Sequence, residues 1–485
     1  MRGKSYLNIN TLAIVHLYIP VILFFAGWFN IPVAIIGIAL ILGAVILFCK
    51  DNRDGDSLLK SFKSTRGLVW LLLSLLILLM MSILTGAGGL VTSSDDWSKH
   101  YFIIEQMGRS SWPVTIDYQG KTGVLSYYIG SYMLPALFMK MTGSTLVSDV
   151  VLLIWVVAGL LMCALLIYST VRNAKPYKLF IIACVIVLFC TFMLPCKILL
   201  SSLQPEDLMS GFLWFGAHAN VVYSSDVNQI RWAFAQAVPG WLCTALFFKY
   251  RYRRNHWGII LSSSILYSAF VFIGLLIMMV ALAVYDCIKG KYKEFIKPEN
   301  IISVMPAFIV ALVYLFSYMQ PKSINDGMSF SFIDWNGHWA AFVLLHCTWL
   351  PFILILRNSK HRDMLVFVSV FLLAISFVEM GEFNDLCLRS TIPAMFILCI
   401  LFLEKVLDDS TAWWVRSLLL ILMFLMFIPD GGRTMLRESY NGLSRDNRAY
   451  VFTSLEDFAE RKGGFVINQY YNWDTDGPIK YLIRR

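Results

Sequence analysis

The chain has 485 residues, of which 58% are hydrophobic and only 15% are charged, and its formal net charge is +9. A soluble domain has about 25% charged residues, so this composition excludes an ordinary soluble enzyme and indicates a membrane protein. The basic excess reports topology rather than nucleic-acid binding, because Lys and Arg gather in the cytoplasmic loops of membrane proteins.

The apolar runs predict an all-α polytopic protein. Crossing a hydrocarbon core takes roughly 20 apolar residues, and the runs amount to about 11–13 transmembrane helices. An N-terminal region, 1–66, contains a tight hairpin of two spans, 11–28 and 31–49, followed by a basic loop. A transmembrane core, 67–429, begins with the span 67–86. Its later spans are 147–170, 178–194, 231–248, 301–319, 338–357, 364–380, 390–405 and 414–429.

Two apolar segments do not suit a single crossing. Residues 124–142 contain Pro135 and three tyrosines, and we expect them to lie along the membrane surface. Residues 257–287 are too long for one span and too short for two, and we expect a short hairpin that returns to its starting side. The cytoplasmic segments then hold 23 Lys and Arg residues and the outer loops before the tail hold 8, as the positive-inside rule requires.

Polar residues gather in three stretches on the predicted outer side and in a C-terminal region, 430–485. The stretches are 87–146, 195–230 and 381–389. The C-terminal region holds the remaining nine basic residues, but a segment of this length can be translocated regardless of its charge. We therefore expect a small extracytoplasmic α/β tail.

The first outer stretch carries two adjacent carboxylates, Asp95 and Asp96, directly after a span. They suit the start of a helix, because Ser94 can cap it and early acids favour the positive end of the helix dipole. Lys99 lies within pairing reach of both acids. One acid is enough to start a helix, however, and two adjacent carboxylates at a membrane face are also candidates for acid–base chemistry. The spacing alone leaves both interpretations open.

Polar side chains also stand at two later helix ends. Arg231 lies at the mouth of a predicted span, where it suits either snorkelling to the interface or binding. Gln236 lies inside the same span, and a buried amide needs a partner or a cavity. Asn384, Asp385 and Arg389 crowd a short connection, where the arginine suits either a turn or a phosphate clamp.

Together these features resemble the GT-C superfamily of polytopic membrane glycosyltransferases, which use lipid-phosphate-linked sugars. The resemblance rests on the DD pair after an early span, the aromatic-rich helix and WP that follow it, and LSYYIGSYMLPALFMKMTGS as a second juxtamembrane helix. The segments RWAFAQAVPGWL and GEFNDLCLRSTIPA also resemble patterns of bacterial members. It covers residues 67–429. The chain departs from the family in its two extra N-terminal spans, its small tail and the absence of a second, DxD-type motif.

The resemblance implies transfer of a sugar from a polyprenyl-phosphate donor to a glycan or lipid acceptor, at the extracytoplasmic face of a bacterial cytoplasmic membrane. Asp95 or Asp96 would be the general base of an inverting reaction, and the family pattern favours the first. The implied donor-phosphate and substrate-binding residues are Lys99, His100, Arg231, Gln236, Asn384, Asp385 and Arg389. No metal ligands are predicted, although the resemblance leaves a requirement for a divalent cation open.

Three other classes share this membrane setting. A transporter or flippase for lipid-linked glycans would usually show paired or inverted repeats, and the sequence shows none. An O-antigen polymerase or ligase resembles the chain less, because such proteins depend on arginines in a large late loop, whereas the largest loop here is early and acidic. A non-catalytic scaffold would not need three polar outer stretches.

Overall fold

The structure is a computed structural model of residues 1–485. Most of the transmembrane core and short parts of the tail are described. The described residues are 8–52, 62–91, 95–190 apart from 119 and 172–173, 223, 225–290, most of 293–318, 330–332, 361–380, 384–428, 470–473, 482–484 and a few scattered residues of the tail.

The described chain is mostly helical, and six of its helical segments are long and apolar enough to cross a membrane, which supports a multi-pass membrane protein. They are α1 (Ile9–Trp28), α2 (Ile31–Asp51), α3 (Thr65–Leu84), α6 (Thr145–Thr170), α11 (Ala269–Ile288) and the pair α17 (Asp385–Ser390) and α18 (Ile392–Leu407).

Five other predicted spans coincide with helices that do not reach this combination of length and hydropathy within the described residues. They are α7 (Tyr177–Leu188), α9 (Asp226–Tyr250), α12 (Pro298–Tyr318), α16 (Arg362–Ile375) and α19 (Trp413–Phe427). The predicted span 338–357 lies outside the described residues. The expected total of about eleven full crossings therefore stays a prediction.

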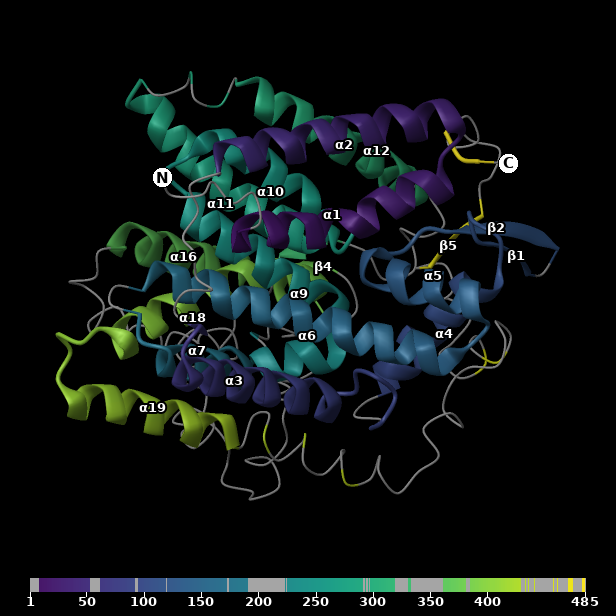
Figure 1. Ribbon diagram of the computed structural model, residues 1–485. Helices are drawn as coiled ribbons and strands as arrows, with labels where there is room; N and C mark the ends of the chain where they lie inside the picture. Colours follow the sequence, from purple (N-terminus) through teal and green to yellow (C-terminus); the bar gives the residue numbers. More distant parts are fainter. Residues whose placement is uncertain are drawn as a thin grey trace.

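The most buried helices are α9, which lies near the middle of the view in Figure 1, and the α17–α18 segment. α9 packs against α6, α10 (Trp257–Ser264) and α18, and nearly all of its side chains are buried. In the most apolar part of the α17–α18 segment 89% of the residues are buried, whereas in the corresponding parts of α2 and α3 only 28% are. The peripheral helices expose apolar residues such as Ile35 and Leu72, as expected for surfaces that face lipid.

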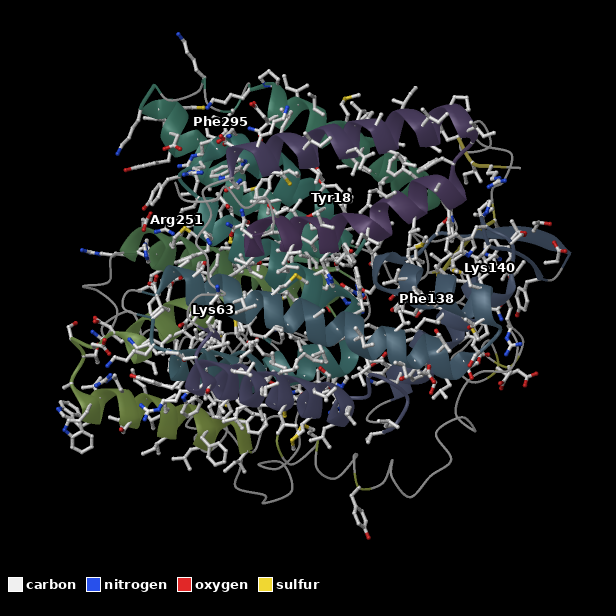
Figure 2. All side chains as sticks on the ribbon, viewed as in Figure 1. Tyr18, Lys63, Phe138, Lys140, Arg251 and Phe295 are labelled. Carbon is white, nitrogen blue, oxygen red and sulfur yellow. The ribbon has the colours of Figure 1, made fainter. Side chains whose placement is uncertain are left out.

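The two ends of the bundle differ in character. The end that we call the hairpin end carries α4 (Asp95–Arg109), α5 (Met133–Thr142) and the antiparallel strands β1 (Thr115–Tyr118) and β2 (Lys121–Leu125). The opposite end, the basic end, carries Lys178, Lys249, Arg251 and Arg254. Figure 2 labels Arg251 at the basic end and Lys140 at the hairpin end.

The chain reverses within 257–287, in agreement with the short hairpin expected there. α10 has only eight residues, and the chain reverses at 265–268 before α11 begins. The short helix η5 (Arg254–His256) precedes α10, and Arg254 forms an ion pair with Asp286 in the last turn of α11. The start and the end of the α10–α11 segment therefore lie together at the basic end.

The predicted surface location of 124–142 agrees with its fold. The segment forms the end of β2, the short helix η2 (Gly130–Tyr132) and α5, which has ten residues and is too short to cross a membrane. β1 and β2 form a hairpin that the sequence analysis did not anticipate. Short strands β3 (Phe330–Phe332) and β4 (Val378–Met380) pair elsewhere.

The described parts of the tail return to the hairpin end. Strand β5 (Tyr471–Asn472) pairs with β2, and Ile483 forms a β-bridge with Phe29 at the end of α1. This places these described residues of the tail at the same end of the bundle as α4, in agreement with the predicted topology.

The reversal at 265–268 can be tested by labelling from each side of the membrane. Cys287 is exposed at the end of α11, and Lys121 is exposed on the β-hairpin. We expect an impermeant maleimide to label a Lys121→Cys variant in intact cells and Cys287 only in inverted vesicles, with Cys287→Ser as the control. Labelling of both positions from the same side would show that 257–287 crosses the membrane once.

Candidate functional site

Helix α4 is fixed on the bundle by its aromatic face. Trp97 is fully buried and stacks on Phe234 of α9, with ring centroids 4.6 Å apart and ring planes 4° apart. Gly86 has φ +118°, and a Cβ there would lie 2.2 Å from Nε1 of Trp97. Only glycine fits this position. The hydroxyl of Tyr101 donates to the carbonyl of Gly86 at 2.9 Å, which closes the connection from α3 to α4.

Asp96 and Lys99 form an ion pair on the first turns of α4. Nζ of Lys99 lies 3.0 Å from Oδ1 of Asp96, and the carboxylate side chain is 43% exposed while the lysine is 12% exposed. Partial burial opposes ionisation of Asp96, but the charges of Lys99 and Arg389 outweigh it and lower the pKa of the carboxyl to about 2. Asp96 is therefore a carboxylate at any physiological pH.

His100 holds α4 against two neighbouring segments and is 2% exposed. Nε2 lies 3.2 Å from the carbonyl oxygen of Trp232, and Nδ1 lies 2.6 Å from the hydroxyl of Tyr132. A carbonyl oxygen only accepts, so Nε2 carries the proton and Nδ1 accepts from Tyr132. Burial lowers the pKa of His100 to about 3, which keeps the ring neutral. His100 thus connects α4, α9 and η2 rather than facing a substrate.

α17 is positioned by a polar turn and a close helix contact. Asn384, with φ 48°, caps α17 by accepting from the amide of Cys387 at 3.3 Å, and its own amide donates to the carbonyl of Val378 at 3.1 Å. A Cβ on Gly274 of α11 would lie 2.1 Å from the carbonyl oxygen of Ser390. The backbones of α11 and α17 therefore touch, and only glycine permits this approach.

Asp385 and Arg389 form a second ion pair one turn apart on α17. Nη2 of Arg389 lies 3.1 Å from Oδ1 of Asp385, and the two side chains are 20% and 22% exposed. Nε of Arg389 is buried and has no hydrogen-bond partner among the described residues. We call Asp96, Lys99, Asp385 and Arg389 the charged cluster, because Arg389 is close enough to interact electrostatically with both Asp96 and Lys99.

Two tyrosines lie beside the charged cluster, and they were not predicted as site residues from the sequence. Tyr127 and Tyr470 lie with ring centroids 4.5 Å apart, and both interact with the charge of Arg389. Burial, Tyr127 and Asp96 raise the pKa of Tyr470 well above its usual value, so its hydroxyl stays protonated. The only sequence signal for Tyr127 was its place in the apolar segment 124–142, which contains three tyrosines. Nothing in the sequence pointed to Tyr470.

Three predicted binding residues are buried among the helices and turns. Arg231 is only 5% exposed within α9, which excludes snorkelling. The amide oxygen of Gln236 accepts from the hydroxyl of Ser268 at 2.8 Å, so its partner is the cap of α11. Asn384 is fully buried in the turn that caps α17. The side chain of Asp95 lies outside the described residues.

The described residues contain no group of three or more His, Cys, Asp or Glu side chains that could hold a metal ion. The one described carboxylate of the acidic pair is already engaged by an ammonium group. No reaction step is assigned to a divalent cation.

Comparisons with known proteins add no identification. No family model matches this chain, and it matches no curated protein and no solved structure.

The buried neutral state of His100 predicts a pH-dependent stability. The pKa of His100 in the folded protein, about 3, lies below the ordinary value of 6.5. As the pH falls below 6.5, His100 therefore binds a proton in the unfolded chain but not in the folded chain. Stability is therefore lost as pH falls. Compared with His100→Gln, the parent should lose about 2 kcal/mol more unfolding free energy between pH 7 and pH 5. Unfolding in detergent micelles at several pH values measures this, and parallel profiles would contradict it.

Proposed function

We propose that the chain is a GT-C-type membrane glycosyltransferase that moves a sugar from a polyprenyl-phosphate donor to an acceptor hydroxyl at the hairpin end. One observation carries the proposal: α4, an amphipathic helix that begins with the acidic pair, lies within electrostatic reach of Arg389 from α17. The residues are separated by almost 300 positions in the chain. A carboxylate and a guanidinium at one membrane face are the groups that proton abstraction and phosphate binding need.

The positive-inside rule assigns the two faces. The basic end carries lysines and arginines at several helix termini, so by this rule it faces the cytoplasm. The hairpin end, with the charged cluster, then faces the extracytoplasmic side. For a bacterial cytoplasmic membrane this is the side on which a polyprenyl-phosphate sugar would donate to a glycan or a lipid.

The two aspartates receive different roles. A general base works best when its pKa lies near the operating pH, and the pKa of Asp96, about 2, is too low. Asp95 is therefore the proposed base. It takes the proton of the acceptor hydroxyl while the acceptor oxygen bonds to the anomeric carbon. The anomeric bond to the phosphate oxygen breaks, the electron pair leaves with the polyprenyl phosphate, and the configuration inverts. Asp96, held by Lys99, orients the acceptor.

Arg389 is the proposed phosphate ligand. Its side chain is partly exposed, and its described carboxylate partner, Asp385, is partly exposed as well, so a phosphate oxygen can replace a carboxylate oxygen at the guanidinium. Charge-assisted hydrogen bonds of this kind are about twice as strong as neutral ones. Tyr470, as a neutral hydroxyl beside Arg389, can donate to the same phosphate.

The division between the aspartates predicts unequal losses. Asp95→Asn should lower transfer about 100- to 10,000-fold, the usual contribution of a general base. Asp96→Asn should lower it about tenfold or less, because asparagine keeps an oxygen that can orient the acceptor and only the partly exposed ion pair with Lys99 is lost. The assay is release of polyprenyl phosphate from a panel of polyprenyl-phosphate hexoses and pentoses by membrane vesicles. The reverse order of losses would assign the base to Asp96. Movement of the donor across the vesicle without release of polyprenyl phosphate would indicate a flippase.

Removal of the Arg389 guanidinium should weaken use of the donor. Arg389→Ala should raise the donor KM about 10- to 100-fold, since a hydrogen bond to a charged group contributes about 1.5–3 kcal/mol. Arg109→Ala is the matched control, because Arg109 lies at the same end on α4 but its side chain is 66% exposed and 3.9 Å from Glu105. Equal effects of the two substitutions, or an Arg389→Ala effect confined to protein yield, would contradict the phosphate role.

A further inference from the structure

A second candidate ligand site lies at the basic end, opposite the charged cluster. A cavity of about 210 Å³ opens where α9, α11 and the start of α16 meet. Arg251, Arg254 and Lys289 bring three positive charges to its lining, against the two carboxylates of Asp286 and Asp363.

Arg251 supplies a buried charge without a direct counter-ion. It is 6% exposed, and its described hydrogen-bond partners are the carbonyl of Phe248, at 2.7 Å, and the ring of His361. Its guanidinium also lies over the rings of Phe248 and Tyr252, at 4.5 and 4.6 Å, but neither ring carries a negative charge. Glu404 reaches it only through His361, with 3.0 Å between His361 Nε2 and the carboxylate. Nε of Arg251 is buried with no hydrogen-bond partner in the described part of the chain. A buried cation without a paired anion is unfavourable, so a bound anion would stabilise it.

Arg254 is held in place beside the same cavity. Its Nε donates to Asp286 at 2.5 Å, and its guanidinium lies over the ring of Trp257 at 4.4 Å. Nη1 remains buried and unpaired among the described side chains. Arg254 is therefore held beside the cavity, with one N–H that no described side chain uses.

The rim of the cavity is built for a membrane interface. Tyr285 is 55% exposed and its hydroxyl accepts from Nζ of Lys289. Tyrosine and lysine in this combination are typical of the headgroup level of a bilayer. Asp363, in the first turn of α16, lines the cavity, and three and seven residues further along α16 lie Val366 and Val370, exposed by 48% and 60%. Positions three and seven residues apart share one face of a helix, so this apolar stripe runs from the cavity mouth along α16.

We propose that this cavity binds the phosphate headgroup of an anionic phospholipid of the cytoplasmic leaflet, with its acyl chains along the α16 stripe. Basic pockets between transmembrane helices on the cytoplasmic side suit such headgroups. The stripe is the reason to favour a lipid over a free phosphate ion, because a soluble anion would gain nothing from it.

The chain also contains a matched control cavity. A second cavity of about 220 Å³ lies at the same end and is lined by Lys50, Asp51 and Glu299 among others. It has one lysine but no arginine in its lining. Lys50→Gln removes the same charge from the same end of the protein as Lys289→Gln does, without touching the proposed site.

The test uses the full-length protein in nanodiscs of phosphatidylcholine with increasing phosphatidylglycerol, and bound phosphatidylglycerol is counted by native mass spectrometry. Lys289→Gln should weaken binding about fivefold, since one basic residue near the surface contributes about 1 kcal/mol. Lys50→Gln should leave binding unchanged. Val370→Ser, which keeps every charge, should also weaken binding.

Three outcomes would overturn the proposal. Equal effects of Lys289→Gln and Lys50→Gln would show that only the general basic charge of this end attracts lipid. Unchanged binding in Lys289→Gln would exclude the cavity. Displacement of phosphatidylglycerol by equimolar inorganic phosphate, with no effect of Val370→Ser, would identify a site for a small anion. None of these depends on sugar transfer, so the glycosyltransferase proposal stands or falls separately.

Discussion

The break between α10 and α11 is the constraint on which the rest of the structure depends. A reversal of the backbone inside an apolar bundle exposes polar groups, and each one left unsatisfied costs several kcal/mol there. Hydrogen bonds to other segments satisfy several of the polar groups of this turn. The amide of Gly130 donates to the carbonyl of Leu266 at 3.2 Å, and Ser268 both caps α11 and donates to Gln236 at 2.8 Å. The hydroxyl of Tyr267 donates to the carbonyl of Leu17 at 2.8 Å. The turn thereby fixes α1, α9 and η2 relative to one another.

Both halves of the charged cluster rest on this turn. α4 contacts α9 and η2 through His100, and α17 touches α11 at Gly274. A shift of the turn would therefore move Asp96 and Arg389 relative to each other, although neither residue contacts it directly. Buried polar contacts of this kind favour one arrangement over others, because any alternative leaves hydrogen-bonding groups unpaired.

The fold was partly predictable from the sequence because its main determinants are local. The length of 257–287 and the charges on its flanks were enough to predict the return of the hairpin, since a bilayer sets the length of a crossing and basic loops set its direction. Lys99 was predicted to lie within reach of Asp96 because helix spacing alone decides it. The β1–β2 hairpin was missed, because an amphipathic helix was expected to dominate that loop.

The site was less predictable because its assembly is non-local. Gln236 and Asn384 suggested binding, but their partners, Ser268 and Val378, become visible only when α9, α11 and β4 are placed. Tyr470 lies more than 300 residues from Tyr127, yet their rings are in contact. Polarity inside an apolar segment indicates that a residue has a partner, and it does not distinguish a partner in the protein from a ligand.

The two ends of the bundle differ in how their charges are compensated, and this difference suggests different kinds of ligand. In the charged cluster each cation has a carboxylate one turn away on its own helix. A phosphate entering there must displace a carboxylate, and the carboxylate returns when the phosphate leaves, so the site is stable both empty and occupied. Arg251 has no directly paired carboxylate among the described residues. An anion bound beside Arg251 pairs with a buried charge, and its dissociation would leave that charge unpaired again, which is unfavourable. The compensated site therefore suits a substrate that exchanges in every turnover, and the uncompensated one suits a lipid that stays bound.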